Sequence, residues 1–170
     1  MPESRERTEK ERGQGAQGDA PQDTAQDAAT ETASGTAGAE ELDERMRVAL
    51  HAASDKKAHD LVVLDLREVA TFTDFFVIAS GTNVRQVQAV ADAVEEQLRR
   101  QLGVKPARIE GYNSAEWVLL DYGDFIFHVF EEKSRRFYDL ERLWRDAARV
   151  SLPPDLSSSG EGGGSLRDAR

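Results

Sequence analysis

The chain has 170 residues, of which 39% are hydrophobic and 32% charged, with no cysteine and a formal net charge of −10. This length accommodates one domain. The absence of cysteine excludes disulfides, thiolate zinc sites, iron–sulfur clusters and cysteine nucleophiles. Because phosphate contacts need clustered Lys and Arg, an acidic chain predicts little direct nucleic-acid binding and favours a basic or neutral partner.

The sequence carries no signal for a membrane or for export. Its longest apolar runs are far shorter than the roughly 20 residues that span a bilayer, so we expect no membrane association. The N-terminus, which begins Met1-Pro-Glu-Ser-Arg, lacks the apolar core of a secretory signal. We therefore expect a cytoplasmic protein.

Composition divides the chain into a folded part between two polar tails. Residues 1–40 contain no Val, Ile, Leu, Phe, Trp or Tyr and hold nine acidic and four basic residues, a composition typical of disorder. Residues 155–170 are rich in Ser and Gly, which predicts a flexible C-terminal tail. The expected domain covers 41–154, and its 20 acidic and 16 basic residues make it only mildly acidic.

The first half of this domain alternates helices with apolar strands. A first helix is indicated by apolar residues at helical spacing: Leu42, Met46, Leu50 and Ala53. Buried strands are expected at 60–66 and 75–79, because both runs are short and apolar. An amphipathic helix then follows from 84 to 102, with Asn83 as its N-cap and Gly103 as its C-terminal stop.

The second half predicts a short strand at 108–110 and a β-hairpin formed by 117–121 and 125–130, with Gly123 in the turn. A final helix ending at two prolines is indicated by an apolar stripe: Phe137, Leu140, Trp144 and Ala147. Apolar strands separated by amphipathic helices favour the α/β or α+β class. We expect a single domain with a mixed sheet of about five strands packed by helices.

The turn Ser80-Gly81-Thr82-Asn83 lies between a strand and a helix N-terminus, where free amides can hold a phosphate. It has a single glycine and lacks the lysine of a Walker loop, and an ordinary strand-to-helix turn looks the same. The ordinary turn is the favoured interpretation.

Other residues suited to chemistry are scattered. The aspartates lie at expected strand ends and turns without an Asp-x-Asp pair, where local hydrogen bonding is their usual role. His51, His59 and His128 have no ligand spacing, and a hydrogen-bonded sheet histidine is the favoured account of His128. We expect no catalytic residue, metal site or cofactor.

The strand at 117–121 is the most informative segment. Side chains alternate along a strand, so Trp117, Leu119 and Asp121 share one face while Val118 and Leu120 share the other. If the second pair packs inward, the first face presents aromatic, aliphatic and acidic groups suited to binding a protein. The alternative is that both faces are covered and Trp117 belongs to the core.

A series of residues between Arg45 and Trp144 forms a distinctive pattern: Asp65, Val69, 72–82, 86–87, 116–124, 128–130, Arg136, Tyr138, Leu140, Glu141, Leu143 and Trp144. This pattern closely resembles the ribosomal silencing factor family, also called Iojap-like. It covers nearly all of the expected domain and neither tail.

The resemblance implies a compact α/β domain with the outline of a nucleotidyltransferase but without its catalytic carboxylates, and therefore no enzyme. It also implies binding to the large ribosomal subunit through its ribosomal protein number fourteen, at the face that meets the small subunit. Such binding blocks subunit joining and lowers translation. Family members also appear in large-subunit assembly, including that of mitochondria and chloroplasts, and form dimers in isolation, so the free protein is expected to form a homodimer.

The resemblance further implies that the hairpin is the docking surface. Its expected binding residues are Trp117, Leu119, Asp121, Tyr122 and Asp124. The carboxylates of Asp121 and Asp124 are expected to pair with Lys or Arg of a basic ribosomal protein.

Two other functions compete with this one. The first is a nucleotidyltransferase-like enzyme with a nucleotide pocket built from Asp74 and Ser80-Gly81-Thr82, which requires bound nucleotide and a divalent metal. The second is direct RNA binding through a small basic cluster: Arg99, Arg100, Lys105 and Arg108. Cations that complement a helix C-terminus account equally well for that cluster.

Overall fold

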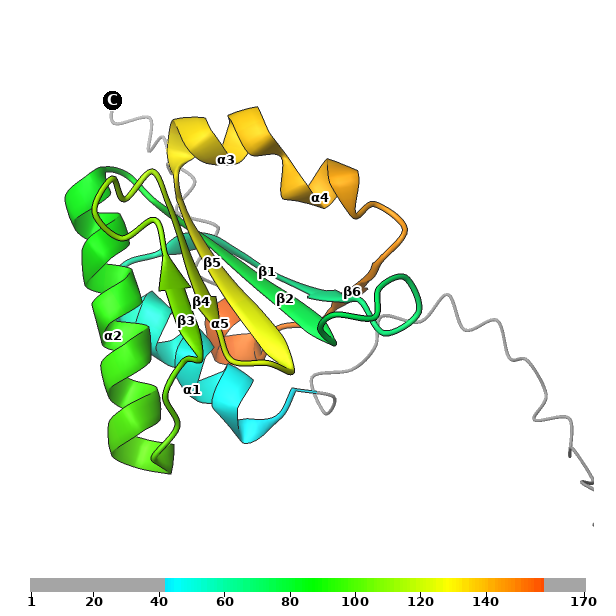
Figure 1. Cartoon of the computed structure of the whole chain (residues 1–170), viewed down its shortest axis with the longest axis horizontal. Helices are drawn as coiled ribbons and strands as arrows, with labels where there is room; N and C mark the ends of the chain where they lie inside the picture. The colour runs from blue at the N-terminus through cyan, green and yellow to red at the C-terminus, as the bar shows by residue number, and fades with distance from the viewer. Residues whose placement is uncertain (1–41, 158–170) are drawn as a thin grey trace, which may run out of the picture. The chain divides into compact units, whose positions relative to one another are not determined.

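The computed structural model describes residues 42–157, and Figure 1 shows how their helices and strands are arranged. The elements in chain order are α1 (Glu44–Asp55), β1 (His59–Asp65), β2 (Phe75–Gly81), α2 (Val84–Leu102), β3 (Arg108–Glu110), β4 (Trp117–Asp121), β5 (Phe125–Glu131), α3 (Glu132–Tyr138), α4 (Leu140–Leu143), β6 (Ala148–Val150) and α5 (Pro154–Ser157).

The strands form one six-stranded sheet in the order β3-β4-β5-β2-β1-β6. Only β2 and β5 pair in parallel, and the other neighbours are antiparallel. Helices α1 and α2 cover one face, and the α3–α4 segment lies over the other (Figure 1). This mixed sheet packed by helices confirms the predicted fold class.

Two apolar cores lie on the two faces of the sheet. The larger core joins the sheet to α1, α2 and α5 and includes Leu50, Val94 and Phe127, all fully buried. The smaller core lies under the α3–α4 segment: Leu64, Leu66, Phe76, Ile78, Ile126, Phe130 and Leu140. Side chains from both faces of β4 and β5 therefore contribute to packing.

The ends of α2 follow the predicted chemistry. The Asn83 side chain accepts a hydrogen bond from the amide of Gln86 at 2.9 Å, which satisfies one free donor of the first turn. Gly103 ends the helix in the left-handed conformation with φ of 66°, where a residue without Cβ is unstrained.

The predicted final helix is wrong. Asp139 adopts the left-handed conformation with φ of 44° and separates α3 from α4, a conformation that Asp tolerates better than most residues. Phe137, expected on the buried stripe, is 81% exposed, whereas Leu140 is buried. The chain beyond Trp144 forms β6, which pairs with the free edge of β1 and gives the sheet a sixth strand.

The packed domain extends slightly past its expected end at Pro154. Helix α5 runs to Ser157 and buries Leu156 against the larger core, so residues 155–157 of the expected C-terminal tail belong to a packed helix, while Asp155 and Ser157 themselves are exposed. The disorder expected for 1–40 and the flexibility expected for 158–170 concern segments outside the described residues. No helix within 42–157 has the length and apolar character needed to cross a membrane.

Candidate docking face

Strand β4 divides its side chains between the two sides of the sheet. Val118 and Leu120 point toward α1 and α2 and are almost completely buried. Trp117 and Leu119 point to the other side, where they pack against the smaller core and remain partly exposed. We call Trp117, Leu119, Tyr138, Phe72 and Trp144 the docking face.

The Trp117 side chain is held between the sheet, through Phe130, and helix α3, through Tyr138. Its ring stacks on Phe130 with centroids 4.9 Å apart, and Tyr138 of α3 contacts it at 4.8 Å. Its Nε1 donates a hydrogen bond to Nδ1 of His128 at 3.0 Å. The tryptophan is therefore neither a free surface residue nor a fully enclosed core residue, and its position is fixed.

His128 is a buried sheet histidine, as predicted. It is 2% exposed, and burial lowers its pKa from 6.5 to about 3, so the ring is neutral at physiological pH. Because Nδ1 accepts from Trp117, the ring proton lies on Nε2, which has no hydrogen-bond partner among the described residues. A buried ring in this state supports Trp117 and is a poor general base.

The acidic residues of the hairpin already have partners. Asp121 accepts a hydrogen bond from the amide of Gly123 at 2.8 Å and lies 3.6 Å from Arg108 on β3. Asp124, directly before β5, forms an ion pair with Arg45 of α1 at 2.8 Å. Hydrogen bonds to Asp124 and Asp43 raise the pKa of Arg45. Both carboxylates nevertheless keep exposed oxygen surface beside the hairpin turn.

Tyr122 lies away from the docking face, contrary to its expected place. It is buried on the helix side, where its ring stacks on Phe125 at 4.9 Å. Its hydroxyl has no partner within the described residues, and burial raises the pKa of this hydroxyl above its ordinary value. Side-chain alternation predicts this outcome, because Tyr122 follows Asp121 and takes the side of Leu120.

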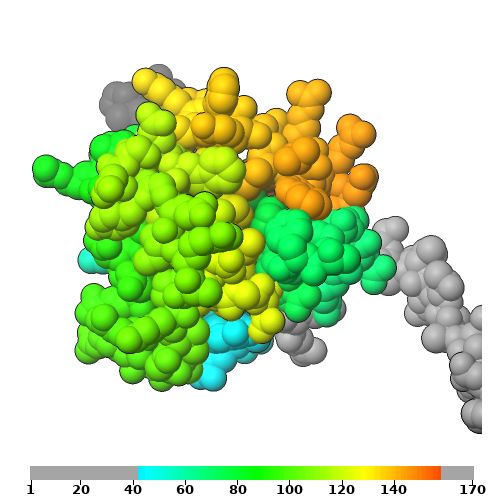
Figure 2. Space-filling model, viewed as in Figure 1, coloured from blue at the N-terminus to red at the C-terminus, as the bar shows by residue number. Residues whose placement is uncertain are grey.

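Three aromatic residues of the docking face were not assigned from the sequence. Phe72, in the loop before β2, is 57% exposed and contacts Trp144 at 5.8 Å. Figure 2 shows that this loop and the segment around α4 lie side by side. Tyr138 is 46% exposed beside Trp117. All three residues belong to the family pattern, which was the only sequence signal that could have placed them together.

The predicted nucleotide pocket is not assembled. Asp74 precedes β2 and Ser80 lies near its far end, which places them roughly 20 Å apart along the strand. The Ser80 hydroxyl is 2.7 Å from Nη1 of Arg135, and the amide of Thr82 donates to the Gln86 side chain at 2.7 Å. The groups that would hold a phosphate are thus occupied by the protein's own side chains.

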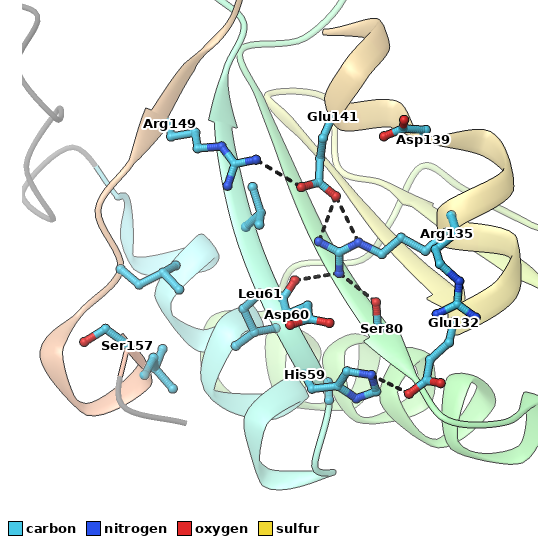
Figure 3. A pocket seen from close by; sticks show the side chains of 15 residues that line it. His59, Asp60, Leu61, Ser80, Glu132, Arg135, Asp139, Glu141, Arg149 and Ser157 are labelled. Carbon is cyan, nitrogen blue, oxygen red and sulfur yellow. Dashed lines mark hydrogen bonds and ion pairs between the residues drawn. The ribbon is translucent and has the colours of Figure 1, made fainter. Parts of the chain in front are cut away.

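A cavity of about 690 Å³ lies beside Ser80, between α3 and the β1–β6 edge, and Figure 3 shows its lining. Arg135 fills its centre, contacting Glu141 at 2.9 Å and the carbonyl of Asp60 at 2.6 Å. The strand β1 is irregular here, with Asp60 at φ of 50°, and the pairing register shifts between His59 and Val62. This network fastens α3 to the sheet and leaves Arg135 little capacity for a ligand.

The remaining predicted groups are dispersed. His59 contacts Glu132 at 2.9 Å, and His51 lies 3.5 Å from Asp155, so each histidine has a separate local partner. Within 42–157, no three His, Asp or Glu side chains come together in a way that could hold a metal ion.

Comparison with known families agrees with this architecture. Residues 39–166, most of the chain, match the family described as "Ribosomal silencing factor during starvation". The chain belongs to the ribosomal silencing factor family. Membership connects the protein with the ribosome and with the regulation of translation, and confirms the resemblance found in the sequence.

Two bacterial silencing factors are similar over almost their whole length, and a plant protein over part of its length. RsfS of Halalkalibacterium halodurans is 41% identical over 114 residues, which cover 67% of this chain and 97% of that protein. RsfS of Bacillus subtilis is 37% identical, with 63% and 90% covered. The chloroplastic protein Iojap of Zea mays is 34% identical over 61% of this chain and 45% of its own. These relatives are named as silencing factors or Iojap proteins, not as enzymes.

A solved structure shares the fold. A crystal structure of a Chromobacterium violaceum protein matches with a TM-score of 0.58 at 34% identity, covering 65% of this chain and 88% of that chain.

Proposed function

We propose that this protein binds the large ribosomal subunit through its docking face and sterically prevents the small subunit from joining. The partner is the basic ribosomal protein number fourteen of the large subunit, at the surface that meets the small subunit. The observation that carries the proposal is the partly exposed pair Trp117 and Leu119, fixed above a packed core. Repression of translation follows from occupancy alone, without a chemical step.

A fixed aromatic surface suits tight binding. Aromatic anchors commonly dominate binding energy at protein interfaces, and an anchor that is already ordered loses little entropy on binding. The hydrogen bond to His128 and the stack on Phe130 restrict the Trp117 ring. Arg135 restricts α3, which carries Tyr138 beside it.

Charge at the edge of the docking face favours a basic partner. Asp121 shares the outer side of β4 with Trp117 and Leu119, and Asp124 follows the hairpin turn. A Lys or Arg of the partner can approach the exposed oxygens of these carboxylates. Such contacts at the rim raise the association rate and specificity more than the affinity.

The folded core is large enough for steric exclusion. A domain of about 115 residues has a radius of gyration of roughly 13 Å. Subunit surfaces in direct contact leave no space for a body of that size. The same occupancy on a free large subunit during its maturation accounts for a role in assembly, since a bound factor keeps that surface unpaired.

The test combines sedimentation with a joining assay. The full chain should sediment with purified large subunits and reduce their joining to small subunits. Leu119→Lys should weaken both effects, because a cation then meets the basic partner. Ile109→Lys is the matched control: Ile109 is 38% exposed on neighbouring β3 but pairs with Leu120, on the helix side of the sheet. Unimpaired subunit joining at saturating wild-type protein would reject the proposal.

We further propose that free copies form a homodimer through the docking face, which covers its apolar surface while no ribosome is bound. Light scattering should then give a mass above 18.8 kDa at high protein concentration. The Leu119→Lys variant should shift toward the monomer, whereas Ile109→Lys should not.

A further inference from the structure

The α3–α4 segment carries an unusual group of cations for an acidic protein. Lys133, Arg136, Arg142 and Arg145 are all exposed, and none makes an ion pair with another described residue. They fall within thirteen consecutive residues that run along one side of the domain (Figure 1). We call these four cations, with Phe137 and Leu143, the cationic ridge.

Most carboxylates near the ridge are turned to internal contacts. Glu131 accepts a hydrogen bond from the amide of Lys133, Glu132 pairs with His59, and Glu141 pairs with Arg135 and Arg149. Asp139 and Asp146 are the exposed acids that remain in the segment. The outward surface is therefore locally positive, although the chain as a whole is strongly acidic.

Helix electrostatics explains only part of this arrangement. Cations near a helix C-terminus complement the helix dipole, which accounts for Arg136 at the end of α3 and Arg142 at the end of α4. Lys133 lies in the first turn of the same helix, where the dipole disfavours a cation. Arg145 follows α4 and belongs to no helix. The helix dipole therefore accounts for only two of the four cations.

The ridge also holds the two most exposed large apolar side chains of the described residues. Phe137 is 81% exposed and Leu143 is 71% exposed. An exposed aromatic ring between cations is the combination that binds RNA, because the ring stacks on a base while Lys and Arg contact phosphates.

We propose that the cationic ridge contacts ribosomal RNA on the large subunit, next to the protein that occupies the docking face. This inference rests on the proposed function. Tyr138 joins the two surfaces: its ring contacts Trp117 at 4.8 Å and its neighbour Phe137 at 5.1 Å. One bound molecule can therefore meet a protein with one surface and an RNA strand with the other.

The net charge of the protein gives this contact its selectivity. A chain of charge −10 is repelled by RNA at large, so four cations give little binding to free RNA. Beside an already docked partner, the same four cations act at high effective concentration. The RNA contact then adds affinity only at the correct site on the subunit.

The salt dependence of subunit binding tests the ridge. Each phosphate contact contributes roughly 0.7 to 0.9 to the slope of log affinity against log salt concentration. A variant in which all four cations of the ridge are changed to Gln should have a shallower slope, smaller in magnitude by about 3. The four changed residues are Lys133, Arg136, Arg142 and Arg145. The matched control changes four other exposed cations without described ion pairs to Gln: Lys56, Arg85, Arg99 and Lys105. The control should keep the wild-type slope.

Crosslinking distinguishes an RNA partner of the ridge from a protein partner. A photoreactive phenylalanine analogue at position 137 should attach the factor to RNA of the large subunit. Equal slopes for the ridge variant and the control, or crosslinks to a ribosomal protein only, would overturn the RNA contact. Leu119→Lys binds poorly at every salt concentration if the docking face is correct, so the two proposals fail separately. A wild-type protein that does not bind subunits overturns both.

Discussion

The two faces of the sheet are built from similar apolar residues but are covered to different degrees. The face toward α1 and α2 is sealed, with Val118, Leu120 and Phe127 at most 1% exposed. The other face is covered in its middle by the α3–α4 segment and left partly open over β4, at Trp117 and Leu119. Alternate residues of one strand therefore lie in a sealed core on one side and on a partly open surface on the other, where we propose that the partner binds.

Adjacent leucines of β4 give the largest expected contrast. Leu120→Ala should lower the free energy of unfolding by about 2 to 5 kcal/mol, because it leaves a cavity in the sealed core. Leu119→Ala should cost clearly less, since water can reach its site. Denaturant unfolding of both variants measures the difference. Equal losses would mean that the two faces are equally packed.

Trp117 tests the recognition side of the comparison. Trp117→Ala should weaken large-subunit binding by about 2 kcal/mol or more, the magnitude of an interface anchor. Because the ring also contacts Phe130 and His128, some loss of stability is expected, and binding must be measured where the variant is folded. Tyr122→Phe is the control on the sealed face: it removes only a hydroxyl without a described partner and should bind like the wild type.

The sequence predicted the sealed face better than the open one. The pattern of β4 and β5 defined the hairpin, and the capping residues Asn83 and Gly103 defined the ends of α2. These features depend on local spacing, which the sequence displays directly. The sequence left the inward side of β4 open, and alternation assigns Val118 and Leu120 to one side together once the structure shows that side to be buried.

The open face depends on contacts between distant segments. Tyr138 meets Trp117, and Trp144 meets Phe72, because the α3–α4 segment folds back over the sheet, which no local period reveals. The apolar spacing from Phe137 to Ala147 predicted one continuous helix, but Asp139 separates α3 from α4. The tertiary pairing of β6 with β1 then overrode helical spacing. Tyr122 was misplaced because the family pattern includes it without stating which way it points.

His128, which lies beneath Trp117, makes the stability of the fold depend on pH. Its pKa is lowered from 6.5 to about 3 in the folded protein, so protonation favours the unfolded chain. The stability contributed by the neutral ring is fully present above pH 6.5 and is lost as pH falls toward 3, by about 1.4 kcal/mol per pH unit. Comparing His128→Gln with the wild type between pH 7 and pH 4 isolates this loss, because Gln does not titrate and can still accept from Trp117. Parallel stability curves would show that His128 is not the group responsible.

Removing residues 1–40 should have the smallest effect of all. That segment has no aliphatic side chain larger than Ala, apart from Met1 and Pro, and no aromatic one to add to either core. The cut must stop before Leu42, which is 3% exposed and belongs to the larger core. The truncated protein should melt within about 2 °C of the full chain, since surface changes usually alter stability by less than about 0.5 kcal/mol. Its subunit binding should be retained or strengthened, because the segment holds nine acidic and four basic residues and is repelled by nearby RNA. Binding at low salt should respond most, which separates charge repulsion from a change in the docking face. A large fall in melting temperature would show instead that the segment packs on the domain, and then one of the two faces needs it.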